Sequence, residues 1–264
     1  GADLYLIATP FAGLRETVRA LRHQPDRPLI WACKGLEAGS GRLAHEIVAD
    51  ERGADVPCGM LTGPSFAAEV ARGLPAAITL AARDPAFATT WAQALHQPRL
   101  RLYANTDIVG CEIGGALKNV IAIAAGVADG MGFGLNARAA LITRSLAEIA
   151  RLAETFGGRA ETLMGLAGMG DLILTCTGDL SRNRQVGLAL AAGKTLDDIL
   201  NDLGHVAEGV STTREVARLA RLHNIDMPVC TTVDALLHDG LAAREAVECL
   251  LARDPKQENP HRPS

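Results

Sequence analysis

The run Ile108-Val-Gly-Cys-Glu-Ile-Gly-Gly-Ala-Leu-Lys-Asn-Val-Ile-Ala-Ile-Ala-Ala125 lies between two parts of the chain that follow different patterns. It is apolar or small at most positions and long enough for several helical turns, and helical patterns continue after it. Before it, short apolar runs alternate with amphipathic stretches, which is typical of a doubly wound parallel sheet. We therefore predict a partial Rossmann-like α/β domain over residues 1–105 and a mainly helical, all-α domain over residues 106–264.

Each expected element follows from the spacing of its apolar residues and from the turn residues beside it. The expected strands are Leu4–Ala8, Leu29–Cys33, Pro57–Leu61, Ala77–Ala81 and Leu100–Ala104. The expected helices of the first part are Leu14–Arg22, Arg42–Arg52, Phe66–Arg72 and Pro85–His96. Those of the second part are Ile108–Val127, Ala137–Thr155, Gln185–Ala192, Leu196–Leu203, Thr212–His223, Thr231–Leu237 and Ala243–Leu251.

The composition excludes several classes of protein. The net charge of -4 provides no basic surface, so we expect no nucleic-acid partner. We expect no membrane insertion, because by its composition no apolar stretch reaches the length of a membrane span and no signal sequence opens the chain. The histidines lack metal-pair spacing, and the six dispersed cysteines indicate reduced thiols in a cytoplasmic protein. Cys33, Cys111 and Cys249 lie in apolar contexts and are expected to be buried.

Lys118 is a candidate general acid/base. In a helix, its neighbours three, four and seven residues away include no acid, and Glu112 lies on another face. A lysine among small residues is partly desolvated, which favours its neutral form and suits proton transfer near neutral pH. The alternative is a surface lysine whose stem covers apolar residues.

Two candidate anion-binding features follow expected strands. Lys34 comes directly after a strand, at the sheet edge where ligands of such folds bind, although a solvated loop lysine is the alternative. Gly63-Pro64-Ser65 precedes an expected helix, whose free N–H groups and the Ser65 hydroxyl could bind an anion. Ser65 could instead be a simple N-cap.

The helical part contains three further candidate segments. Gly165-Leu-Ala-Gly-Met-Gly-Asp171 does not match the dinucleotide fingerprint Gly-x-Gly-x-x-Gly, and we expect it to bring Asp171 into a cleft. Ser181-Arg-Asn-Arg184 could bind phosphate, or could be the polar start of a helix with Ser181 as its cap. Glu208 lies between small residues in an expected loop. Together with Lys34 and Lys118, these groups suit the reduction of a phosphorylated ketone by a nicotinamide cofactor.

Several segments resemble bacterial NAD(P)-dependent glycerol-3-phosphate dehydrogenases. The resemblance covers the chain in order and is carried by residues 63–75, 112–126, 136–144 and 168–178, with 34–37, 181–184 and 207–209 fitting the same family. It implies a Rossmann-like domain followed by a helical domain like that of 6-phosphogluconate dehydrogenase. It also implies Lys118 as the general acid/base. The implied substrate contacts are Lys34, Gly63, Ser65, Lys118, Asp171, Ser181, Arg182 and Asn183, and the implied cofactor contacts are Lys34, Ala67, Arg182, Val206 and Glu208.

The chain departs from the family at its start. The family begins with a strand, a Gly-x-Gly-x-x-Gly loop and a basic residue that reads the adenosine end, and this chain has neither feature. We expect the first two βα units, about 60–70 residues, to be missing from it. The segment that distinguishes NAD from NADP would lie there, so the cofactor is expected to be NADP or NAD.

The resemblance therefore implies an enzyme that interconverts dihydroxyacetone phosphate and sn-glycerol 3-phosphate. It further implies a cytoplasmic homodimer that supplies glycerophospholipid synthesis. Two alternatives remain open from the sequence. One is a related dehydrogenase of 3-hydroxy acids or 6-phosphogluconate, and the other is a non-catalytic, truncated dimerisation module.

Overall fold

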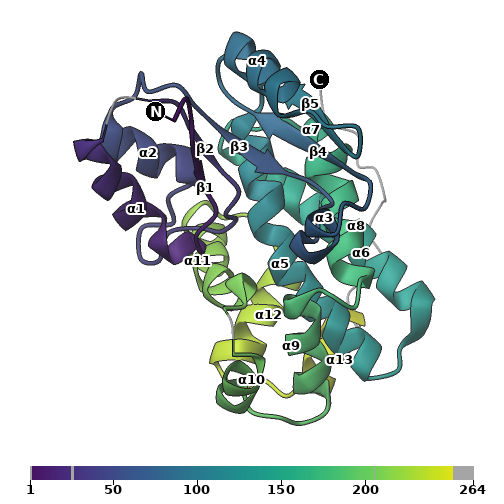
Figure 1. Cartoon of the computed structure of the whole chain (residues 1–264). Helices are drawn as coiled ribbons and strands as arrows, with labels where there is room; N and C mark the ends of the chain where they lie inside the picture. The colour runs from purple at the N-terminus through teal and green to yellow at the C-terminus, as the bar shows by residue number, and fades with distance from the viewer. Residues whose placement is uncertain (1, 25–26, 205, 252–264) are drawn as a thin grey trace, which may run out of the picture.

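The computed structural model describes residues 2–24, 27–204 and 206–251. A twisted sheet with its covering helices occupies one end of the molecule, and a body of helices occupies the other (Figure 1). The sheet's last strand ends at Asn105, and the long helix α5 (Ile108–Gly130) begins three residues later. Residues 252–264 of the predicted helical domain lie outside the described residues.

The sheet has the strand order β1-β2-β3-β4-β5 in the described part of the chain. Its strands are close to those expected from the sequence: β1 (Tyr5–Ile7), β2 (Leu29–Trp31), β3 (Cys58–Thr62), β4 (Ala76–Ala81) and β5 (Leu100–Asn105). All neighbouring pairs are parallel except β3 and β4, which are antiparallel. The expectation of a wholly parallel sheet is therefore wrong at this one pairing.

The short helix α3 (Ala67–Ala71) explains the reversal between β3 and β4. Its five residues rise only about 7.5 Å, whereas a five-residue strand such as β3 spans about 16 Å. The helix is too short to bring the chain back along the sheet for a parallel crossover. Strand β4 therefore begins at the same end of the sheet at which β3 finishes, and it runs in the opposite direction.

The two faces of the sheet have separate apolar cores. Trp31 packs with Leu14 and Ile47, which lie on α1 (Leu14–Ala20) and α2 (Ala44–Arg52). Ile30, the preceding residue of β2, packs with Phe87 of α4 (Pro85–Leu95) in the other core. Successive strand residues point to opposite faces, so α1 and α2 cover one face and α4 covers the other.

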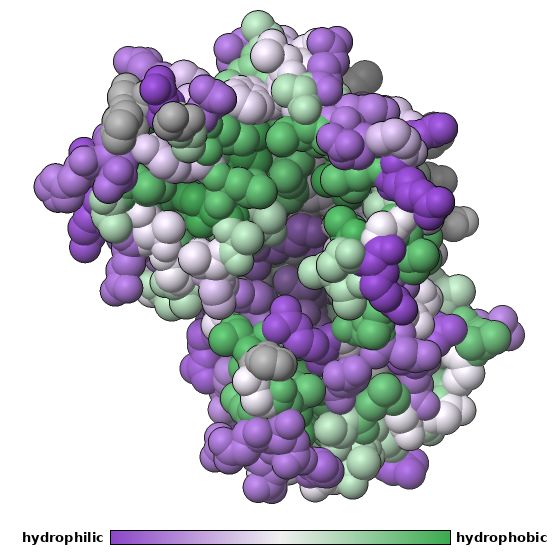
Figure 2. Space-filling model, viewed as in Figure 1, coloured by the Kyte–Doolittle hydropathy of each residue, from purple (hydrophilic) through white to green (hydrophobic). Residues whose placement is uncertain are grey.

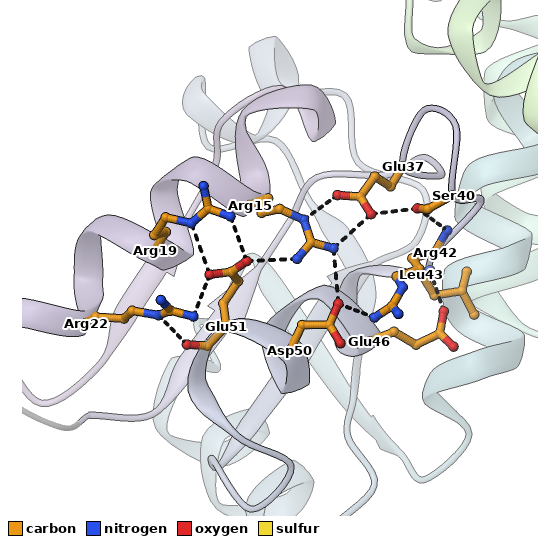
Figure 3. A network of polar contacts seen from close by, with 10 residues as sticks. All are labelled: Arg15, Arg19, Arg22, Glu37, Ser40, Arg42, Leu43, Glu46, Asp50 and Glu51. Atoms are coloured by element: carbon orange, nitrogen blue, oxygen red, sulfur yellow. Dashed lines mark hydrogen bonds and ion pairs between the residues drawn. The ribbon is translucent and has the colours of Figure 1, made fainter.

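Ion pairs fasten α1 to α2 and to the loop that follows β2. The Arg15 guanidinium donates to Glu37 at 2.5 Å and to Glu51 at 2.8 Å, and Arg19 also pairs with Glu51 at 3.0 Å (Figure 3). These partners hold the pKa of Glu51 at about 2, mainly through the hydrogen bond from Arg19. The network fixes the loop that begins with Lys34.

Helix α5 is the axis of the helical part and is buried along most of its length. Contrary to expectation, it is long and apolar enough to cross a membrane, but 94% of its most apolar window is buried inside the protein. A buried core helix accounts for that composition. Around it lie α6 (Gly134–Thr155), α7 (Ala160–Leu163), α8 (Asp171–Thr177), α9 (Arg182–Ala191), α10 (Leu196–Leu203), α11 (Glu208–Leu222), α12 (Pro228–His238) and α13 (Ala243–Leu251).

Two buried carboxylates join helices that are distant in sequence. Glu112 of α5 accepts from the backbone N–H of His45 at 2.9 Å and pairs with its ring, which fastens α5 to the start of α2. Glu148 of α6 accepts from Val229 and Cys230 at the N-terminus of α12, where a negative charge is favourable. Burial nevertheless raises the pKa of Glu148.

The cysteine expectations are confirmed in part. All six thiols are free, and Cys33 and Cys111 are buried as expected. Cys249 is exposed, so the expectation of burial is wrong for this residue. It lies on α13, the last described helix, where an apolar sequence context did not lead to a packed position.

Glycines allow α5 and α9 to approach closely, which generates a stability prediction. A Cβ at Gly187 would lie 2.1 Å from the carbonyl oxygen of Ile123, so one of the two backbones would have to move. We expect Gly187→Ala to lower the free energy of unfolding by about 1–3 kcal/mol, as overpacked cores do. Chemical denaturation would measure this change.

Gly13→Ala is the matched control for that measurement. Gly13 has a φ of -89°, and an added Cβ would lie 3.8 Å from its nearest neighbour, an ordinary contact. The free energy of unfolding of the Gly13→Ala variant should remain within about 0.5 kcal/mol of that of the parent protein. Equal stability of the two variants would contradict the close-packing argument.

Candidate functional site

A cavity of about 950 Å³ lies between the sheet and the helical part. The space-filling view shows this hollow, with apolar surface on the sheet side and polar surface at its floor (Figure 2). The loops after β1 and β2 and helix α3 line it from the sheet side, and α5, α8 and the turn before α9 line it from below. Of the predicted site residues, the cavity is lined by Lys34, Ser65, Ala67, Lys118, Ser181, Arg182, Asn183, Val206 and Glu208.

The Asp171 carboxylate lies between two ammonium groups at the floor of this cavity. Lys118 Nζ donates to Asp171 Oδ1 at 2.5 Å, and Lys34 Nζ donates to Asp171 Oδ2 at 2.6 Å. Lys118 is 9% exposed and Asp171 only 1%. The lack of an acid three, four or seven residues away on its own helix therefore did not leave Lys118 unpaired, because Asp171 reaches it from α8. The alternative of a surface lysine is wrong.

Burial and the neighbouring charges shift both pKa values in this cluster. Burial, followed by the positive charge of Lys34, lowers the pKa of Lys118 to about 7, although Asp171 opposes this shift. Burial alone would raise the pKa of Asp171, but the charges of Lys34 and Lys118 outweigh it and lower that pKa. Lys118 can therefore gain or lose a proton near neutral pH while Asp171 stays ionised.

The glycine-rich segment before Asp171 forms a π-helical turn, Leu166–Gly170. Such turns are rare in proteins, and those that occur often lie at functional sites. A Cβ at Gly168 would lie 2.2 Å from the carbonyl oxygen of Leu163, so this path is open only to glycine. The segment brings Asp171 beneath the cavity, where Asp171 contacts two lysines that line it but is not itself a lining residue.

Ser181 caps helix α9, as one of the two alternatives predicted, by accepting from Arg184 N at 3.3 Å. Asn183 is buried, donates to Asn119 Oδ1 at 3.1 Å and accepts from Gly209 N at 3.0 Å. These bonds hold the start of α9 against α5 and α11. Arg182 is exposed and faces the cavity.

The segment after β3 supplies one wall of the cavity. Ser65 Oγ donates to Gly63 O at 3.0 Å, and α3 begins without a side-chain cap, so the N-cap alternative for Ser65 is wrong. Gly63 has a φ of +129°, and a Cβ there would lie 3.1 Å from Ile78 Cα. Gly63 therefore shapes the turn that carries Ser65 and Ala67 to the cavity.

Val206 and Glu208 lie on the opposite wall. Glu208 is the first residue of α11 rather than part of a loop, which corrects the expectation for it. Its Oε1 accepts from Phe11 N at 3.0 Å and so joins the loop after β1 to the helical part. Burial raises the pKa of Glu208, although this bond and the charge of Arg182 oppose the shift.

Asn119 and Thr175 also line the cavity, although neither is among the residues predicted for the site. Thr175 Oγ1 donates to the backbone oxygen of Asp171 at 2.6 Å, one helical turn away. The available signals were the polar pair Lys118-Asn119 within an apolar run and the four-residue spacing of Asp171 and Thr175.

The residues present fit a nicotinamide cofactor together with a small substrate. The cavity volume is at the upper end of the range for small-molecule and cofactor sites and exceeds the needs of a three-carbon phosphate. Its sheet-side wall is apolar, as a planar ring requires, and its floor carries the charges that a polar substrate requires. A cavity at strand ends, with a buried lysine beneath an apolar wall, is the arrangement that an NAD(P)-dependent oxidoreductase requires.

The chain belongs to the family of NAD-dependent glycerol-3-phosphate dehydrogenases. The N-terminal family model matches residues 1–88, and the C-terminal one matches residues 107–248. The glycerol-3-phosphate dehydrogenase [NAD(P)+] of Aromatoleum aromaticum is 73% identical, over 97% of this chain and 79% of that protein. That of Dechloromonas aromatica is 61% identical, over 98% of this chain and 79% of that protein.

The fold agrees with this family. The crystal structure of glycerol-3-phosphate dehydrogenase from Coxiella burnetii matches with a TM-score of 0.91 at 44% identity, over 96% of this chain and 78% of that one. The predicted family, the fold class and the use of NAD or NADP are confirmed. These matches favour the glycerol-3-phosphate dehydrogenase interpretation over both alternatives, the 3-hydroxy-acid type of dehydrogenase and the non-catalytic module.

The charge cluster predicts opposite shifts for two variants. Lys34→Met removes a neighbouring positive charge and should raise the pKa of Lys118 above about 7. Asp171→Asn removes the negative charge that favours the ammonium and should lower that pKa. NMR titration of labelled lysine side chains, with the Lys118 signal assigned from Lys118→Arg, would measure both. Shifts in the same direction would contradict this account of the cluster.

Proposed function

We propose that this protein interconverts dihydroxyacetone phosphate and sn-glycerol 3-phosphate, using NAD or NADP, with Lys118 as the general acid/base. The observation that carries the proposal is the pair of lysines on one buried carboxylate at the floor of the cavity. A lysine with a pKa near 7 suits proton transfer in either direction at neutral pH. The family to which the chain belongs supports the same substrate pair.

In the oxidation of glycerol 3-phosphate, neutral Lys118 accepts the proton of the C2 hydroxyl. Asp171 stays ionised and stabilises the ammonium that forms, because it already accepts from Lys118 Nζ. Lys34, which shares Asp171 with Lys118, donates to the C2 oxygen and so polarises it. A nicotinamide held by Lys34, Ala67, Arg182, Val206 and Glu208 would supply the hydride acceptor for oxidation at C2 and the hydride donor for the reverse reaction. In that direction the Lys118 ammonium protonates the developing alkoxide.

The start of α9 binds the phosphate group in this proposal. Ser181, Arg182 and Asn183 all line the cavity, and they provide a hydroxyl, a guanidinium and an amide. A guanidinium matches phosphate geometry with two parallel hydrogen bonds. Gly63 and Ser65 contact the substrate from the sheet side in this proposal. Lys34 contacts both the substrate and the cofactor.

Ala67, Val206 and Glu208 contact the cofactor in this proposal, together with Lys34 and Arg182. Ala67 and Val206 contribute apolar surface, whereas Glu208 offers an acceptor for a ribose hydroxyl or an amide. Residues 1–105 then form the cofactor-binding part and residues 106–264 the substrate and catalytic part. We further propose a cytoplasmic homodimer that supplies glycerol 3-phosphate for phospholipid synthesis and has neither a nucleic-acid partner nor a membrane-inserted segment.

The first test of the function replaces the proposed acid/base. Lys118→Ala should lower kcat for glycerol 3-phosphate oxidation by roughly 10²–10⁴-fold, since general acid–base catalysis contributes about that much. Lys194→Ala is the matched control, because Lys194 is an exposed lysine paired with Asp202, and it should retain the parent kcat. The reduction of NAD⁺ or NADP⁺ at 340 nm is the measurement. A Lys118→Ala enzyme with near-normal turnover would rule out the assignment.

The second test is the pH dependence of both reaction directions. The lowered pKa of Lys118 means that its neutral form predominates above about pH 7. Oxidation, which needs the neutral amine, should therefore rise through pH 7 and then level off. Reduction, which needs the ammonium, should fall over the same interval. Parallel profiles in the two directions, once corrected for cofactor stability, would place the proton transfer elsewhere.

A further inference from the structure

Residues 178–183, the turn after α8 together with the first two residues of α9, are held in place by a side chain that the proposed chemistry does not use. Ser181, Arg182 and Asn183 of this anion-binding turn line the cavity, whereas Arg184 is directed at two carboxylates. Its Nε and Nη2 donate to Asp129 Oδ2 at 3.0 and 2.8 Å. Its Nη1 donates to Asp179 Oδ1 at 3.0 Å.

Asp129 links this arginine to the helix that carries the catalytic lysine. Asp129 lies on α5, eleven residues after Lys118, which is three helical turns plus about 20° and so almost the same face. The two residues are about 16 Å apart along the helix. Asp129 also accepts from Arg138 of α6 at 2.9 Å, so its own position is fixed from two sides. Its side chain and that of Arg184 are each only 12% exposed.

The opposite end of the turn is held by an apolar contact. A Cβ at Gly178 would lie 2.6 Å from Phe66 Cε2, so the aromatic ring rests directly on the backbone there. Arg184 also shares the N-cap of α9, since its backbone N–H donates to Ser181 Oγ. A displacement of Arg184 would therefore move Ser181 and the two residues between them.

We infer that Asp129 and Arg184 are positioning residues that set the affinity of the anion-binding turn for the phosphate group. The inference rests on the proposed function, because it takes the substrate phosphate as the ligand of this turn. Asp129 holds the guanidinium of Arg184 in place. Arg184 in turn holds the turn through its bonds to Asp179 and Ser181. The turn then presents three polar groups to the cavity. The same helix thus sets the distance between the phosphate and the Lys118 proton donor.

Two substitutions test the inference without adding bulk. Asp129→Asn removes the charge that orders the guanidinium, and Arg184→Lys keeps a positive charge but loses the fork. Each should raise KM for glycerol 3-phosphate about tenfold and leave kcat within about twofold, the pattern of lost substrate binding. The competitive inhibition constant of inorganic phosphate should rise in parallel. Asp202→Asn, which breaks the exposed Lys194–Asp202 pair, is the matched charge control and should change neither.

The outcomes separate positioning from general structural damage and from failure of the function itself. A loss of correctly folded protein would lower kcat but leave KM and the phosphate inhibition constant unchanged, and this result would overturn the inference. Unchanged kinetics in both variants of an active parent enzyme would overturn it too. A parent enzyme that does not oxidise glycerol 3-phosphate would instead contradict the proposed function.

Discussion

One buried carboxylate between two ammonium groups is the interaction on which the cavity depends. Two lysines this close would repel each other, and only the ionised Asp171 allows both to occupy the floor. Lys34 and Asp171 are 137 residues apart, so their contact joins the loop after β2 to α8. Because the carboxylate is buried, loss of either lysine partner would be costly, since it would leave charge unpaired at this depth.

The surrounding structure keeps this cluster in a fixed geometry. Close contacts at glycines bring α9 against α5, and the π-helical turn delivers Asp171 through a path closed to larger residues. Glu112 fastens α5 to α2, and Glu208 fastens α11 to the loop after β1. The two parts of the molecule are therefore joined by directional bonds around the cavity rather than by apolar contact alone.

Much of this could be predicted from the sequence, and the reasons for the failures are physical. Strands and long helices have short-range apolar periods, so their places were close to those expected. The antiparallel pairing of β4 and the exposure of Cys249 depend on tertiary packing, which local patterns do not contain. The Asp171 partner of Lys118 lies 53 residues away, so helical spacing could not pair them, and a shared chemistry together with the family resemblance placed both in one site. Asn119 and Thr175 went unnoticed because each is an ordinary polar residue until the fold places it in the cavity wall.

The reversal between β3 and β4 has a consequence for how such a cavity could change its shape. Because β4 runs antiparallel to β3, the connecting residues 63–75 form a lip that leaves the sheet and returns to it at the same edge. Ser65, Phe66 and Ala67 of this lip line the cavity, but residues could be inserted at its exposed end, residues 72–75, without altering the register of the strands or the position of Lys118. The length of this loop can therefore change while the catalytic residues stay in place. Such changes would widen or narrow the opening of the cavity for larger or smaller ligands.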